Sequence, residues 1–222
     1  LAEHCHVVAC DLIGFGESGR KREAPYFDVE LWVRQGLAML DLLGDGPLGV
    51  AGHSLGGALA LKVASRDPRV GKVLTSSTIG TAYELNEALD GFWTLPSERS
   101  QLRPVMERMF YDGDAVSEEM IDGRWELLAQ EGYSEYFAAM FKSPRQPYID
   151  EAVLSDGELG SITADVVMLH GRNDQPCPAE DTTLDLAPAL LGADIHLFRR
   201  CGHNLPWERS GDYLAAATAL FQ

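Results

Sequence analysis

The stretch Pro47–Gly57, with the sequence PLGVAGHSLGG, constrains the fold of this chain more than any other segment. A short apolar run ends in Gly52–Gly56, and a helical pattern of apolar residues begins at once and ends before Asp67. This order is typical of a nucleophile elbow, the G-x-S-x-G turn that joins a strand to a helix. We therefore predict that Ser54 is a nucleophile, held in a strained backbone conformation at the top of a strand.

The residues around the serine support this interpretation. A Cβ atom at Gly52 or at Gly56 is expected to collide with the neighbouring turn, so both positions should require glycine. The turn should aim the backbone N–H of Leu55, at a helix N-terminus, at a developing oxyanion. The competing interpretation is an ordinary turn with a buried serine, since the five-residue pattern is weak by itself. Its position between a strand and a helix favours the elbow.

Length and charge limit the classes of protein to consider. A chain of 222 residues, 45% of them hydrophobic, can form one domain with a substantial core and an insertion. The net charge of −16 argues against nucleic acid or an anionic membrane as a partner. We find no pattern of a signal peptide or membrane span, because the longest apolar runs have the length of strands. The spacing of the four cysteines does not match that of a disulfide scaffold, so we expect the protein to be in a reducing cytoplasm. These cysteines are Cys5, Cys10, Cys177 and Cys201.

Two motifs near the start of the chain are interpreted as having no ligand. His6–Asp11 is predicted to be a short strand. The side chains of a strand alternate between two faces. We therefore do not expect the side chains of His4, Cys5, His6 and Cys10 to converge on a metal ion. Gly14–Gly19 matches the dinucleotide fingerprint G-x-G-x-x-G, but Pro25 follows where a helix should pack on the sheet. We predict a glycine-rich loop there, and no metal or cofactor in this chain.

The rest of the chain alternates between strand and helix patterns. Strands are predicted at Val70–Ser76, Asp165–His170 and Asp194–Phe198, and helices at Phe27–Leu43, Ala179–Ala189 and Pro206–Phe221. Strands joined through helices by short connections favour an α/β fold with a mostly parallel sheet and helices on both faces.

Residues 79–149 interrupt this alternation with helical patterns and no convincing strand. Their aromatic and methionine residues, such as Phe92-Trp93 and Met106, are interpreted mainly as the core of a helical lid over the strand ends. We therefore expect three parts: residues 1–78 form the first part of the α/β core, 79–150 the lid and 151–222 the second part of the core.

Three residues are predicted to form a catalytic triad. Ser54, Asp174 and His203 each follow a predicted strand at its carboxyl end, where open parallel sheets bind ligands. A serine hydroxyl becomes nucleophilic when a neutral imidazole accepts its proton, and a carboxylate holds that imidazole in the required tautomer. His53 is expected to point away from the serine and to pack in the structure. A structural role is also expected for the remaining histidines His4, His6, His170 and His196.

With these motifs in place, the sequence resembles the α/β-hydrolase superfamily and, within it, the meta-cleavage product hydrolases, which break a carbon–carbon bond in ring-cleavage products. Tyr111–Asp112 with Gly123–Glu126 looks like the lid helix whose arginine meets the carboxylate and enolate end of the substrate. Phe137–Phe141 with Pro144–Gln146 is similar to the semialdehyde-hydrolase branch. Trp207–Glu208 matches the tryptophan of the family's active site.

The resemblance implies a small-molecule substrate of the 2-hydroxy-6-oxohexa-2,4-dienoate type, such as 2-hydroxymuconate semialdehyde. Arg124 would bind its carboxylate, because a guanidinium is planar and permanently charged. Phe141 and Trp207 would line the apolar part of the site. The alternatives are a solvated or ion-paired Arg124 and simple core packing for the two aromatic residues. The resemblance also implies a homo-oligomer.

The sequence departs from the family pattern in three ways. His53 stands where asparagine is usual, and Asn204 stands where an aromatic residue often follows the histidine. Full-length relatives carry three strands and a His-Gly loop, with a second oxyanion donor, before the strand expected at His6–Asp11. We therefore expect these residues to be a fragment that lacks about 50 residues.

Two other functions remain open at this point. A carboxylesterase or lactonase could use the same triad, and a non-catalytic or inactive truncated relative could share the fold. Haloalkane dehalogenases and epoxide hydrolases are excluded, because their chemistry needs an aspartate where Ser54 stands.

Overall fold

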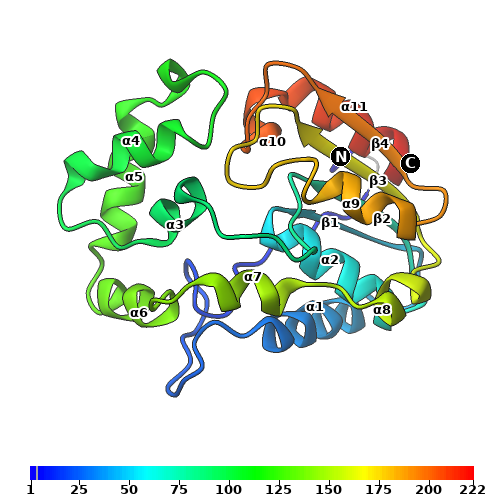
Figure 1. Ribbon diagram of the computed structural model, residues 1–222. Helices are drawn as coiled ribbons and strands as arrows, with labels where there is room; N and C mark the ends of the chain where they lie inside the picture. Colours follow the sequence, from blue (N-terminus) through cyan, green and yellow to red (C-terminus); the bar gives the residue numbers. More distant parts are fainter. Residues whose placement is uncertain (4) are drawn as a thin grey trace.

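Four parallel strands form the sheet at the centre of the fold, in the order β1-β2-β3-β4 (Figure 1). The computed structural model describes residues 1–3 and 5–222. The strands are β1 (Leu48–His53), β2 (Val70–Ser76), β3 (Asp165–Gly171) and β4 (Asp194–Phe198). The strands expected near residues 70, 165 and 194 are thus confirmed. Since all three pairings are parallel, the carboxyl ends of the strands lie at one edge of the sheet.

Helices cover both faces of the sheet. On one face lie α1 (Val29–Leu43), α2 (Leu55–Arg66) and α8 (Asp156–Ser161), and on the other lie α10 (Leu205–Glu208) and α11 (Ser210–Phe221) (Figure 1). Helix α2 is buried from Gly57 to Ala64 because it packs between β1, β2 and α1. In the sequence, the short helix α9 (Thr183–Leu186) follows β3 and precedes β4. The predicted α/β fold is confirmed.

A helical segment separates β2 from β3. It contains α3 (Glu87–Trp93), α4 (Leu102–Glu107), α5 (Glu118–Leu128), α6 (Tyr133–Met140) and α7 (Gln146–Ala152). Figure 1 shows α3 to α6 grouped at one side of the core, whereas α7 runs back alongside α2. We refer to residues 87–140 as the cap. None of the helices in residues 1–3 and 5–222 is long and apolar enough to cross a lipid bilayer.

An aromatic cluster joins the cap to the core. Phe141, directly after α6, stacks on Trp93 of α3 with ring centroids 5.4 Å apart. Phe27, two residues before α1 begins, has its ring centroid 5.7 Å from that of Phe141 and 4.6 Å from that of Tyr148 in α7. Close aromatic pairs of this kind stabilise a fold beyond their burial alone. The cluster therefore anchors the cap to the first helix of the core.

Three predicted elements differ in the structure. Residues 6–11 form no strand, and Val7 and Val8 are half exposed, because the described chain offers them no strand to pair with. The helix expected over Ala179–Ala189 is shorter, since Pro188 lacks the N–H that an α-helix needs and ends it in a 3₁₀ turn. The last predicted helix is divided at Arg209, whose φ of −130° and ψ of 43° leave the helical region.

Candidate active site

Ser54 occupies the sharp turn between β1 and α2. Its φ of 55° and ψ of −122° lie outside the regions that L-residues favour, so the strained backbone predicted for this serine is confirmed. The Ser54 amide donates a hydrogen bond to the carbonyl of Ser76 on β2, at 2.9 Å. Helix α2 begins at Leu55, which places the Leu55 amide at a helix N-terminus.

Close packing explains one of the two predicted glycine requirements. A Cβ atom at Gly52 would collide with the backbone carbonyl of Gly56. The collision expected at Gly56 was wrong, because a Cβ there would meet open space. The second close approach is instead at Gly57, where a Cβ would collide with the side chain of Thr78. The turn therefore needs glycine at Gly52, and α2 needs it at Gly57.

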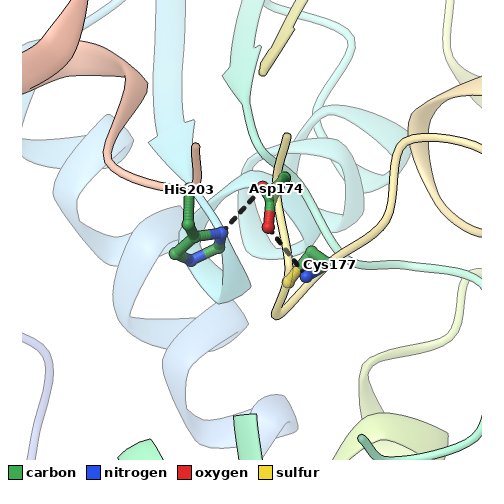
Figure 2. Close-up of side chains that lie close together, drawn as sticks. All are labelled: Asp174, Cys177 and His203. Carbon is green, nitrogen blue, oxygen red and sulfur yellow. Dashed lines mark hydrogen bonds and ion pairs between the residues drawn. The ribbon is translucent and has the colours of Figure 1, made fainter. Parts of the chain in front are cut away.

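The structure brings Ser54, His203 and Asp174 into one chain of hydrogen bonds. The Oγ of Ser54 lies 3.0 Å from Nε2 of His203, and Nδ1 of His203 lies 2.9 Å from Oδ2 of Asp174. Figure 2 shows the second of these contacts. The three residues follow β1, β3 and β4 at the edge where the carboxyl ends meet. A carboxylate accepts from Nδ1–H, which leaves Nε2 able to accept the serine proton.

Asp174 and His203 change each other's pKa. Burial alone would raise the pKa of Asp174, but the charge and hydrogen bond of His203, together with His170, hold it well below its usual value. Burial alone would lower the pKa of His203, but the charge and hydrogen bond of Asp174 dominate and hold it well above its usual value. Asp174 is therefore ionised and stabilises the protonated form of the imidazole.

His170, predicted to be structural, lies behind Asp174. Its Nε2 lies 2.8 Å from the carbonyl of Cys177 and 3.2 Å from Oδ2 of Asp174, and its Nδ1 lies 2.7 Å from Oγ1 of Thr183. A carbonyl only accepts, so Nε2 carries a hydrogen and donates it to Cys177. The Cys177 amide donates to Oδ1 of Asp174 at 2.8 Å. These bonds fix the orientation of the carboxylate.

The placement of His53 corrects the expectation that it points away from the serine. Its ring centroid lies 4.8 Å from that of His203, and its Nδ1 lies 3.0 Å from Oγ of Ser76. Burial, reinforced by the charge of His203, lowers the pKa of His53 to about 3. His53 is therefore a neutral ring beside the imidazole of His203, in the wall of the same cavity as Ser54.

Glu208 ties the loop that carries His203 to the cap. Its Oε1 accepts from the amide of Gly202, and its Oε2 accepts from the amide of Tyr111, both at 2.8 Å. A Cβ atom at Gly202 would lie only 2.7 Å from the backbone of Phe110, so the loop and the cap are in close contact. The position of His203 thus depends on the cap as well as on β4.

A cavity of about 390 Å³ opens above Ser54 and His203. Its apolar wall comes from the cap and consists of Phe92, Met106, Met109 and Met120. Its remaining lining is formed by His53, Arg124, Asn204 and Trp207. The four residues of the apolar wall were expected to be lid core, and their place in the cavity wall was not predicted from the sequence.

Arg124 of α5 brings a positive charge to this cavity. Its Nη2 donates to the carbonyl of Phe92 at 3.0 Å, and its guanidinium carbon lies 3.9 Å from the centroid of the Phe92 ring. Its Nε is buried without a hydrogen-bond partner, and no carboxylate pairs with the guanidinium among residues 1–3 and 5–222. Burial lowers the pKa of Arg124 to about 10, so the side chain stays charged at neutral pH. Arg124 therefore differs from both alternatives, because its Nε is shielded from solvent and no carboxylate of the described chain pairs with it.

The two aromatic residues predicted for the site are placed differently. Trp207 of α10 lines the cavity and is 68% exposed. Phe141 does not line it, and the structure corrects that expectation: the ring is 4% exposed and packs against Trp93 and Phe137. The physical reason is that Phe141 follows the end of α6 on the side that faces the core.

One group of metal-ligating residues occurs within the described part of the chain. In residues 1–3 and 5–222, only Asp174, Cys177 and His203 bring three such side chains within reach of a single ion (Figure 2). His4, from the group considered in the sequence analysis, lies outside the described residues.

Comparisons with known proteins place this geometry in a family. The model of the alpha/beta hydrolase family matches residues 1–217. A 2-hydroxy-6-oxo-2,4-heptadienoate hydrolase of Pseudomonas putida strain F1 is 35% identical over 97% of this chain and 80% of its own length. A 2-hydroxymuconate semialdehyde hydrolase of Pseudomonas sp. strain CF600 is 32% identical over 99% of this chain and 80% of its own length.

Solved structures agree with these relatives. The meta-cleavage product hydrolase CumD of Pseudomonas fluorescens IP01 superposes with a TM-score of 0.88 and 29% identity, over 95% of this chain and 77% of that one. The 2-hydroxy-6-oxo-6-phenylhexa-2,4-dienoate hydrolase of Rhodococcus sp. strain RHA1 superposes with a TM-score of 0.80 and 25% identity, over 92% and 76%. The chain therefore belongs to the alpha/beta hydrolase family and, within it, to the meta-cleavage product hydrolases.

Proposed function

We propose that this chain hydrolyses a carbon–carbon bond in a meta-ring-cleavage product of the 2-hydroxy-6-oxohexa-2,4-dienoate type. The products are 2-hydroxypenta-2,4-dienoate and a carboxylic acid. The observation that carries the proposal is the position of Arg124, a half-buried cation without a carboxylate partner in the described chain, in the same cavity as Ser54 and His203. A simple ester needs no such cation, whereas the carboxylate and enol oxygens of a dienoate do.

In this proposal Ser54 and His203 act on the C6 carbonyl of the substrate. The substrate first changes from enol to keto form, and His203 carries the proton from the 2-hydroxyl to C5. Ser54, or a water activated by His203, then attacks C6, and the proton of the nucleophile passes to the imidazole. The electron pair of the C5–C6 bond leaves with the dienolate fragment, whose C2 oxygen takes the proton from the imidazolium to give 2-hydroxypenta-2,4-dienoate. Where Ser54 is the nucleophile, water then hydrolyses the acyl-enzyme to the acid, so that one water is consumed in each turnover by either route.

Other residues orient and stabilise the reacting groups. Asp174 stabilises the imidazolium that forms on His203, as its short contact to Nδ1 suggests. The amide of Leu55 donates to the oxyanion that develops at C6. The methionines of the cap and the exposed face of Trp207 accommodate the apolar part of the substrate. Phe141 has no part in this site, because it lies in the aromatic cluster.

The test is hydrolysis by the purified chain of 2-hydroxymuconate semialdehyde, 2-hydroxy-6-oxo-2,4-heptadienoate and 2-hydroxy-6-oxo-6-phenylhexa-2,4-dienoate. Loss of their absorbance, with 2-hydroxypenta-2,4-dienoate identified by mass spectrometry, is the expected result. Turnover of p-nitrophenyl esters without any loss of dienoate would instead indicate a carboxylesterase. The ranking of the three substrates would identify the preferred tail.

We also propose that the protein acts in the cytoplasm and forms a homo-oligomer. The cytoplasmic location is supported by the free thiols, since no disulfide links the cysteines Cys5, Cys10, Cys177 and Cys201. Light scattering of the purified protein tests the second proposal, because a mass of 24.3 kDa would indicate a monomer.

A further inference from the structure

Cys177 is a buried thiol that the proposed mechanism does not use. It lies on the loop after β3, three residues beyond Asp174, and its side chain is fully buried. Its Sγ, a carboxylate oxygen of Asp174 and a ring nitrogen of His203 all lie within 4.8 Å of one another (Figure 2). The Sγ atom also lies 3.6 Å from the hydroxyl of Tyr83. Three different metal-binding side chains, one of them the proposed catalytic histidine, therefore converge at this point.

We infer that Asp174, Cys177 and His203 form a binding site for a thiophilic divalent cation such as Zn²⁺ or Cd²⁺, and that the bound ion inhibits the enzyme. The inhibitory part of this inference rests on the proposed function, because it takes His203 to be the catalytic base. The binding part rests on the geometry alone. This inference departs from the prediction, made from the sequence, that the chain binds no metal.

The donor set suits such an ion. Thiolate, imidazole and carboxylate are the common ligands of zinc, with bonds of about 2.0–2.3 Å and tetrahedral geometry. Ligand atoms around one zinc ion then lie roughly 3–4 Å apart, so the three side chains need to close by only on the order of 1 Å. The soft sulfur favours Zn²⁺ and Cd²⁺ over Mg²⁺ and Ca²⁺, which prefer oxygen.

The surroundings of the three ligands are already held in place. The amide of Cys177 donates to Oδ1 of Asp174, which leaves Oδ2 directed at His203. His170 bonds both to the Cys177 carbonyl and to Oδ2, and so connects two of the proposed ligands. Hydrogen bonds of this kind orient metal ligands and increase metal affinity. The loop between Asp174 and Cys177 is therefore arranged before an ion arrives.

Binding of the ion would remove the base from the reaction. The metal takes the lone pair of Nδ1 of His203, and the hydrogen that Nδ1 donated to Asp174 is transferred to Nε2. Nε2 then donates to Ser54 and no longer accepts its proton. The thiol of Cys177 loses its proton to solvent as the metal–sulfur bond forms, so that one proton is released for each ion bound. Serine activation stops, although the ring stays in place.

The direct test measures Cd²⁺ binding to the whole chain, without turnover. Equilibrium dialysis gives the stoichiometry, and the ultraviolet charge-transfer band of a cadmium–thiolate bond reports the sulfur ligand. We expect the wild type to bind an ion with this band. Cys177→Ser and Cys177→Ala should lose the band and at least about tenfold in affinity. The control Cys10→Ser, at an exposed cysteine, should keep both. His203→Gln should weaken binding, and Ser54→Ala should not.

Inhibition by Zn²⁺ is then measured against the metal-free rate of each variant. The inference predicts strong inhibition of the wild type and of Cys10→Ser, relieved at least about tenfold in Cys177→Ser. A thiolate band that persists in both Cys177 variants, binding that is independent of His203, or no binding to the wild type would overturn the site. X-ray absorption on the cadmium-loaded wild type is independent of variant folding, and a shell without sulfur would also overturn it. The binding arm remains decisive even if no substrate is hydrolysed.

Discussion

The guanidinium of Arg124 lies over the ring of Phe92, with its central carbon 3.9 Å from the ring centroid, and the two side chains share the wall of the cavity above Ser54. The aromatic face and the Phe92 carbonyl hold the cation in a half-buried position. Neither of them neutralises its charge. A cation left in this state is prepared for an anionic ligand, and the carboxylate of a dienoate meets that requirement.

Removal of this charge should affect dienoates selectively. We expect Arg124→Gln to lower kcat/KM for 2-hydroxymuconate semialdehyde about tenfold to a hundredfold, the value of a hydrogen bond to a charged group. Turnover of an uncharged p-nitrophenyl ester should change little. The control Arg108→Gln removes an exposed cap arginine and should leave both rates unchanged. Equal losses on both substrates would contradict the role of Arg124 in binding the carboxylate.

The activity should rise with pH through the pKa of His203. Asp174 holds this pKa above about 6.5, and only the neutral ring accepts the proton of Ser54. The acid limb of kcat/KM is therefore expected above pH 6.5. Asp174→Asn removes the stabilising charge, so the limb should move to lower pH while the rate falls by about 10⁴-fold. A limb that stays in place in this variant would show that another group controls the profile.

The two glycines of the elbow should respond differently to alanine. Gly52→Ala places a Cβ against the carbonyl of Gly56 and should lower the free energy of unfolding by about 3 kcal/mol or more. Gly56→Ala meets open space within a helix and should be neutral or stabilising by up to about 1 kcal/mol. Urea unfolding measures both. Equal destabilisation by the two changes would contradict the packing described here.

The link between Glu208 and the cap should support both stability and catalysis. Glu208→Ala leaves the amides of Gly202 and Tyr111 without their acceptor and should cost about 1–3 kcal/mol of unfolding free energy. The rate should also fall, because Gly202 precedes His203. Glu208→Gln, which retains one acceptor, should have an intermediate effect. The control Glu126→Ala, on the exposed side of α5, should stay within about 0.5 kcal/mol of wild type.

Local patterns in the sequence predicted the sheet and the three residues that meet in the site. Ser54 follows β1 directly, and Asp174 and His203 lie in the loops after β3 and β4, so the parallel order of the strands is enough to bring them together. The strand expected at residues 6–11 was wrong because a strand needs a partner that local sequence does not reveal. Arg124 was found through resemblance to the family, not through its spacing.

The apolar wall of the cavity could not be predicted in the same way. Phe92, Met106 and Met120 come from three different cap helices, and each looks like an ordinary core residue in its own helix. Which face of each helix meets the cavity depends on the packing of the cap against the core. The same dependence placed Phe141 in the aromatic cluster. His53 lies beside His203, and its Nδ1 contacts Oγ of Ser76 on the neighbouring strand, a contact that local sequence does not reveal.

The measurement that tests the central claim most directly is kcat/KM for 2-hydroxymuconate semialdehyde in the wild type and in Ser54→Ala, with products identified. The account predicts that the wild type forms 2-hydroxypenta-2,4-dienoate. Ser54→Ala removes the hydroxyl that lies 3.0 Å from Nε2 of His203, and it should lower the rate at least about 10³-fold. Wild-type turnover that persists unchanged in Ser54→Ala, or no dienoate turnover by a wild type that hydrolyses esters, would contradict it.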